Sequence, residues 1–178
     1  MSEPTAFDNS WRCSTCGEEH DGLATVFGPL EPDPWASASE AQRERGEINR
    51  DTCELPIDDT THYFIRGELR LPVLDAAIDP FVWSVWVSLS GPNMQKTVDH
   101  WVDPERAALP PMFGWLCNWL LPYDPPTTNL AVNVHTRTPG TVPLIELDPS
   151  SDHPLAREQV QGITVHRVAE LKRILLAG

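Results

Sequence analysis

Positive charge is scarce in this sequence. Its 13 Lys and Arg residues stand against 26 Asp and Glu residues, which gives a formal net charge of −13 and a pI near 4.7. Proteins that bind nucleic acid neutralise its phosphates with clustered cations, and the sequence has no such cluster. We therefore expect no nucleic-acid partner. A strongly acidic surface repels anionic membranes and would attract a basic protein partner. The plainer interpretation of the charge is a solvated acidic surface with no such partner.

Long apolar runs and leader-like segments are also missing. No run approaches the roughly 20 apolar residues that a membrane-spanning helix needs, and residues 1–12 have no apolar centre like that of a signal peptide. These features predict a cytoplasmic protein that does not enter membranes. Because thiols stay reduced in the cytoplasm, the 4 cysteines are interpreted as metal ligands or core residues and not as two disulfides.

Familiar catalytic motifs are absent too. The sequence contains no HExxH, no GxGxxG, no P-loop and no Ser-His-Asp motif, so we lean towards a protein that is not an enzyme. Tryptophan, in contrast, is abundant, with 7 residues. Any tryptophan that is exposed would indicate a binding face, because soluble proteins seldom leave large apolar patches uncovered.

The strands are predicted from alternation and from β-branched and aromatic residues. The run Phe81–Ser90 is apolar at almost every position, so it should be a central strand that is covered on both faces. Residues 129–137 alternate cleanly and should form a half-exposed strand, joined in a hairpin to residues 142–147. Further strands are expected at 53–56, 62–66 and 68–73, the last two meeting at Gly67.

Helices are expected between and after these strands. A capping box at Ser37–Glu40 predicts a short helix over 41–45, Asn93 should cap a helix to about Val102, and residues 113–121 are interpreted as a short buried helix. Residues 154–161 and 165–176 should form two final helices, separated at Gly162. The 18 prolines imply long loops between these short elements.

These elements predict an α+β fold. At 178 residues the chain should contain a disordered start over 1–10 and a single domain over 11–178. That domain would have a mainly antiparallel sheet, short helices and a C-terminal helix. At its N-terminal end, residues 11–22 should form a metal-binding turn resembling a zinc knuckle.

The strongest chemical signal is a CxxC motif in that turn. Cys13 and Cys16 can face one ion, and His20 lies four residues further on. Cys53, in a polar stretch, would complete a closed Cys₃His site for structural zinc. Two other interpretations remain open for the motif: a reduced structural pair and a redox dithiol.

A second cluster could support general acid–base chemistry. If the hairpin pairs as expected, His135 and Arg137 could share a face with Glu146, close to Asp152 and His153. A carboxylate beside a histidine can tune a general base. The plainer interpretation is a cross-strand charge pair, with Asp152 and His153 capping the next helix.

Several stretches of the sequence form a combined pattern: Cys13-Ser-Thr-Cys-Gly-Glu-Glu-His20, His62-Tyr-Phe-Ile-Arg-Gly67, Phe81-Val-Trp-Ser-Val-Trp-Val-Ser-Leu-Ser90, Phe113-Gly-Trp-Leu116, Val134-His-Thr-Arg137, Ile145-Glu-Leu-Asp-Pro149 and Asp152-His-Pro-Leu-Ala-Arg-Glu-Gln-Val-Gln-Gly-Ile-Thr164. Together these stretches resemble a family of uncharacterised bacterial proteins, domain of unknown function 2199. The resemblance implies an intact single-domain member. It implies no activity, substrate or catalytic residue.

Three functional hypotheses follow. The first is a zinc-stabilised, acidic, cytoplasmic binding protein, one form of which would be an immunity-type protein that neutralises a basic toxin. The second is a small-molecule hydrolase that uses the region of His135, Glu146 and His153. The third is a redox protein that uses Cys13 and Cys16.

Overall fold

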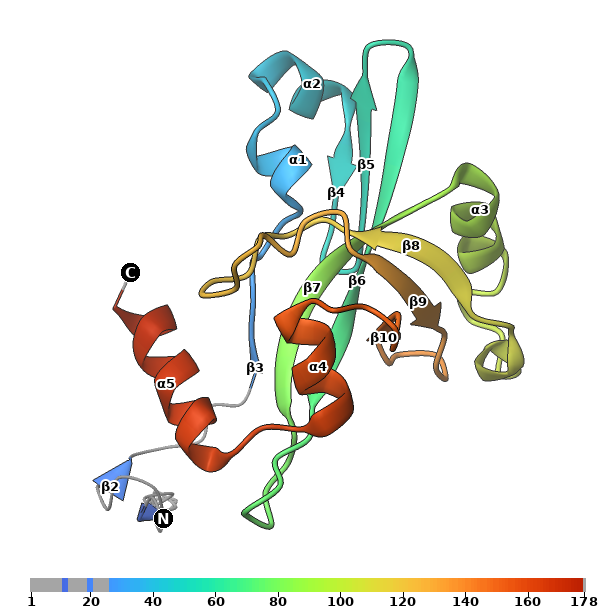
Figure 1. The fold of residues 1–178 in the computed structure, drawn as a ribbon. Coiled ribbons are helices and arrows are strands. Elements are labelled where there is room, and N and C mark those ends of the chain that lie inside the picture. The colour runs from blue at the N-terminus through green and yellow to red at the C-terminus, as the bar shows by residue number, and fades with distance from the viewer. Residues whose placement is uncertain (1–10, 13–18, 21–25, 178) are drawn as a thin grey trace, which may run out of the picture.

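The fold is mixed α+β, as the sequence predicts (Figure 1). The structure is a computed structural model and describes residues 11–12, 19–20 and 26–177. The expected disordered start over 1–10 and most of the expected metal-binding turn over 11–22 lie outside the described residues. Of that turn, the short strands β1 (Trp11–Arg12) and β2 (Glu19–His20) are described, and they pair antiparallel.

An eight-stranded sheet closes on itself to form a small barrel. Its strands are β3 (Val26–Phe27), β4 (Glu47–Ile48), β5 (Thr52–Ile57), β6 (Thr60–Leu71), β7 (Phe81–Leu89), β8 (Met112–Leu116), β9 (Ala131–His135) and β10 (Leu144–Leu147). Antiparallel pairing runs from β6 through β7, β8 and β9 to β10. The ring closes where β10 pairs parallel with β6, at Leu144 and Glu68.

The remaining three strands, β3, β4 and β5, lie outside the ring and extend the sheet beside β6 and β7. β5 and β4 continue the sheet beside the first half of β6, and β3 pairs parallel with β7. The hairpin of β5 and β6 projects beyond the ring at one end, and the turn that joins β6 to β7 projects at the other (Figure 1). The sheet is therefore mainly antiparallel, as predicted.

The predicted break at Gly67 is wrong, because β6 is continuous from Thr60 to Leu71. Gly67 instead lets β10 approach closely. A Cβ at this position would lie 2.6 Å from the side chain of Ile145 and 3.0 Å from the carbonyl oxygen of Pro143. The glycine thus serves ring closure and not a turn.

β7 is the central strand and is covered on both faces, as predicted. One face contributes Phe81, Trp83, Val85, Val87 and Leu89 to the main core. The other face places Trp86 in a second cluster with Trp35, Cys53, Leu55 and Phe64. Two cores meet at this strand, which explains why its sequence is apolar without alternation.

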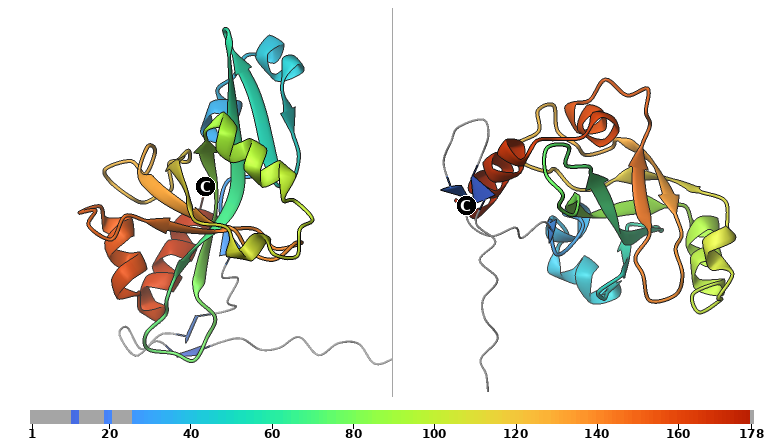
Figure 2. Two further views of the ribbon diagram at one scale, coloured as in Figure 1. Left: turned by 90° about the vertical axis from the view of Figure 1, so that its right-hand side faces the viewer. Right: turned by 90° about the horizontal axis from the view of Figure 1, so that it is seen from below.

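The helices are α1 (Asp33–Ala36), α2 (Glu40–Arg45), α3 (Gly91–Asp99), the 3₁₀ turn η1 (Arg106–Ala108), α4 (Pro154–Gln161) and α5 (Val165–Leu176). The caps of α2 and α3 are Ser39 and Ser90, and not the predicted Ser37 and Asn93. α3 buries Met94 and Thr97 and leaves Val98 exposed. It lies on the opposite side of the hairpin from α5 (Figures 1 and 2).

The two final helices match the prediction closely. α4 ends at Gly162, and the Thr164 side chain caps α5 by accepting a hydrogen bond from the Arg167 backbone N–H. The Tyr123 hydroxyl donates to Glu158 of α4, which also accepts from Nε of Arg167 at 2.8 Å. This network ties both helices to the loop that contains Tyr123.

Candidate functional site

The predicted zinc ligands fall largely outside the described residues. Cys13 and Cys16 are not described, and His20 is described only by its backbone pairing with Trp11. Among the residues that are described, no group of three metal-binding side chains comes together. Zinc binding therefore stays a prediction.

Cys53 lies in the second core and not in the polar setting that its sequence neighbours suggest. Its side chain is 1% exposed, packed with Trp35, Phe64 and Trp86. Burial, aided by the charge of Glu31, raises the pKa of this thiol to about 12. A zinc ion would have to displace that proton to use Cys53 as a ligand.

Cys117 is a second protonated thiol, and it is half-buried against the same cluster. Burial raises its pKa to about 11. Since the thiolate is the nucleophile, neither described cysteine is activated at neutral pH.

The predicted pairing of His135 with Glu146 is confirmed. His135 Nε2 and Glu146 Oε2 are 2.8 Å apart on the exposed face of the β9–β10 hairpin. Arg137 contacts other groups, with Nη2 donating to Glu68 at 3.0 Å and Nε to the carbonyl of Val142. These contacts are ordinary sheet chemistry.

His153 is buried and bonded elsewhere. Its Nε2 donates to the Pro125 carbonyl at 2.8 Å, and its Nδ1 accepts from the Leu155 backbone N–H at 3.1 Å. It therefore caps α4, as the plainer interpretation predicts. With both nitrogens bonded in this way, His153 does not join the pair of His135 and Glu146.

The predicted helix over 113–121 is wrong, and the segment is extended. β8 occupies Met112–Leu116, and burial alternates residue by residue from 111 to 121. Even positions point inward. Four large apolar side chains at odd positions are about half exposed: Phe113 at 50%, Trp115 at 46%, Trp119 at 52% and Leu121 at 55%. We call these four residues the outward row.

A buried polar network holds the segment extended beyond the end of β8. Asn118 is fully buried, and its Oδ1 accepts from the Trp86 backbone N–H at 2.8 Å. Its Nδ2 donates to Asp33 at 2.9 Å, and the second oxygen of Asp33 accepts from the Trp119 N–H at 2.8 Å. The Thr127 hydroxyl accepts a hydrogen bond from the Leu120 N–H and donates one to the Asn118 carbonyl. The segment thereby runs on toward α1 (Figure 1).

Sequence reasoning missed Asn118, Asp33 and Thr127. The available signal was Asn118 itself, a polar residue in phase with the inward positions Leu116 and Leu120. A polar side chain at a buried position indicates a hydrogen-bonded role.

Two rings of the outward row contact each other, and an exposed carboxylate lies two strands away. The rings of Phe113 and Trp115 meet edge to face with centroids 4.9 Å apart. Across the sheet Phe113 is in register with Asn133, which is in register with the exposed Glu146.

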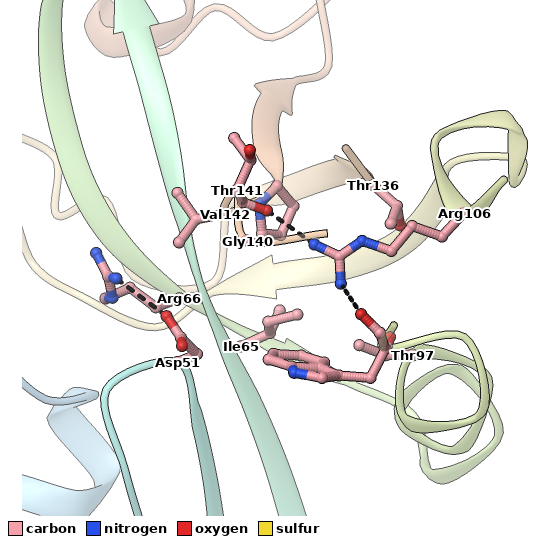
Figure 3. Close-up of a pocket in the computed structure, with 11 residues that line it drawn as sticks. Asp51, Ile65, Arg66, Thr97, Arg106, Thr136, Gly140, Thr141 and Val142 are labelled. Carbon is pink, nitrogen blue, oxygen red and sulfur yellow. Dashed lines mark hydrogen bonds and ion pairs between the residues drawn. The ribbon is translucent and has the colours of Figure 1, made fainter. Parts of the chain in front are cut away.

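A cavity of about 140 Å³ lies between β6, the stretch that follows α3, and the turn before β10 (Figure 3). Arg106 forms one wall and is only 6% exposed. Its guanidinium donates to four carbonyls, those of Trp101, Arg137, Thr138 and Thr141, at 2.6–3.0 Å. It also lies over the Trp101 ring, 5.5 Å from the centroid. We call this space the Arg106 cavity.

Arg66 and Asp51 also line the Arg106 cavity, on the side away from Arg106 (Figure 3). They form an ion pair at 3.1 Å. A wider hollow of about 410 Å³ shares Asp51 and Trp101 with the cavity and is also lined by Arg50. Among the residues that the structure describes, no histidine, cysteine or serine lines either space.

The chain belongs to the family of uncharacterized proteins conserved in bacteria known as DUF2199. The family model matches residues 12–163, which include the whole barrel and α4. No curated protein and no solved structure matches the chain. In the described part of the chain, no helix is long and apolar enough to cross a membrane.

Proposed function

We propose that this protein is a binding module whose docking face is the outward row and whose partner is a basic protein segment. The observation that carries the proposal is the exposure of four large apolar side chains along one extended segment. Soluble proteins rarely leave such residues together in water unless they bind something. Aromatic residues, tryptophan above all, are enriched where protein partners dock.

The charge of the chain favours a basic partner over a second copy. Two chains of net charge −13 repel each other, whereas a segment rich in Lys and Arg is attracted. Two exposed carboxylates lie on segments that neighbour the outward row. Glu146 is two strands from Phe113 and is bonded to His135. Asp124 follows Tyr123, whose carbonyl accepts from the Trp119 indole at 3.2 Å. Cations also stack favourably on tryptophan faces.

Zinc binding by Cys13, Cys16, His20 and Cys53 belongs to the same proposal as a structural element. A closed site of this kind has no open position for substrate, and it would attach the N-terminal turn to β5. The outward row would then bind the partner, and zinc would act only through stability.

Peptide selection tests the proposed function directly. A random peptide library would be selected on the wild-type protein, and the affinity of the surviving peptides would then be measured for the wild type and for a Trp115→Ala variant. We expect the surviving peptides to be enriched in Lys and Arg. Their affinity should fall at least about tenfold for Trp115→Ala, as for an interface hot spot, and should weaken as salt is raised.

The matched control is Val160→Ala, which trims an exposed apolar side chain on α4 that is not part of the outward row. It should leave affinity unchanged. Selected peptides without a cationic bias would contradict the basic partner, and equal binding to Trp115→Ala would contradict the docking face.

A further inference from the structure

Arg106 carries a buried positive charge with no opposite charge beside it. Its four acceptors are all neutral carbonyls, and among the described residues it forms no ion pair with a carboxylate. Of the carboxylates in the described part of the chain, Asp51 alone lines the cavity, and it is paired with Arg66. Burying a charge without a counter-charge is costly, so the cavity favours an anionic occupant.

The walls define what kind of anion fits. Trp101, Ile65, Val142 and Pro143 give an apolar lining, and Thr136 and Thr141 add hydroxyls. A volume of about 140 Å³ resembles cavities of roughly 150 Å³ that admit benzene. The four carbonyl bonds use four of the five N–H groups that a guanidinium has, which leaves one for a ligand.

We propose that the Arg106 cavity binds a small monocarboxylate with a flat apolar body. The carboxylate would lie against the guanidinium of Arg106, a charge-assisted contact, and the apolar body would pack beside Trp101. Arg50, in the wider hollow that adjoins the cavity, would attract the anion towards its entrance. This site is separate from the outward row and does not depend on the proposed binding function.

Benzoate is the probe that tests the proposal, because it combines one carboxylate with a body the size of benzene. Binding would be measured by isothermal titration calorimetry on the full chain, with benzamide as the neutral analogue of equal shape. We expect saturable binding of benzoate and at least tenfold weaker binding of benzamide. Equal affinities, or no saturable binding of benzoate, would overturn the proposal.

Two variants locate the site without removing Arg106, whose four bonds also hold the fold together. Trp101→Ala removes the stacking face, and Val142→Phe fills the cavity; each should weaken benzoate binding at least tenfold. Trp115→Ala, the same substitution in the outward row, should leave benzoate binding unchanged. If both cavity variants bind benzoate like the wild type, the site lies elsewhere and the proposal fails.

Discussion

At the scale of single residues, Asn118 determines how the outward row is presented. It bonds the Trp86 N–H, the Glu31 carbonyl and Asp33, and it is inaccessible to water. These side-chain hydrogen bonds take the place of the inter-strand backbone hydrogen bonds of β8, which ends at Leu116. The outward row therefore depends on a buried amide as much as on its own side chains.

We predict that Asn118→Leu lowers the free energy of unfolding by about 3 kcal/mol. The leucine has similar volume but leaves the buried N–H of Trp86 and the oxygen of Asp33 without their partner. Urea denaturation would measure the loss. Asn133→Leu, the same change at an exposed position of β9, should stay within about 0.5 kcal/mol. Equal losses in the two variants would contradict this role.

A second prediction concerns Cys53 and pH. Its thiol pKa rises from 9.0 to about 12 on folding, so above pH 9 the unfolded chain releases a proton that the folded chain keeps. Alkali therefore favours unfolding, and the stabilisation present below pH 9 is lost as pH rises towards 12. For protein freed of metal with a chelator, we expect Cys53→Ala to lose about 1 kcal/mol less stability than the wild type between pH 8 and pH 10. If the free energy of unfolding changes with pH in the same way in both proteins, the pKa of Cys53 is not raised by folding.

At the scale of elements, the sequence is a good guide where one periodicity dominates. α4, α5, the strand Phe81–Leu89 and the β9–β10 hairpin follow their patterns closely. The helix predicted over 113–121 was wrong because both faces of this extended segment are apolar. Its sequence therefore resembles that of a buried helix, although one face is exposed to water.

Sites assembled by tertiary contact could not be predicted. The ring closure at Gly67 and the Arg106 cavity bring together segments far apart in the chain, and local patterns do not encode such contacts. The pairing of His135 with Glu146 could be predicted because hairpin register is a local property.

Close packing of β8 against β7 gives a prediction at the element scale. A Cβ on Gly114 would lie 2.6 Å from the Ser88 carbonyl oxygen and 2.5 Å from Val87. Gly114→Ala should therefore destabilise the protein by about 2–3 kcal/mol, measured by urea denaturation. Gly91→Ala, where the nearest atom is 3.7 Å away, should be neutral. A neutral Gly114→Ala would show that β8 can move away from β7.

At the scale of the whole molecule, zinc gives the clearest prediction. Protein purified without chelator should contain one zinc ion per chain by elemental mass spectrometry, and Cys13→Ser should abolish it. Chelation should lower the melting temperature. Because Cys53 is also a core residue, metal content and not stability must decide its role. Cys53→Ala that keeps its zinc would exclude Cys53 as the fourth ligand.

The closure of the barrel also has a consequence for synthesis on the ribosome. The hairpin of β6 and β7 is local and can form as soon as both strands have left the exit tunnel. The parallel pairing of β10 with β6 must wait until Leu144 emerges. Until then β6 lacks its partner along that edge, and unpaired edges invite association with other chains. Nascent chains should therefore be most vulnerable to aggregation just before β10 is released.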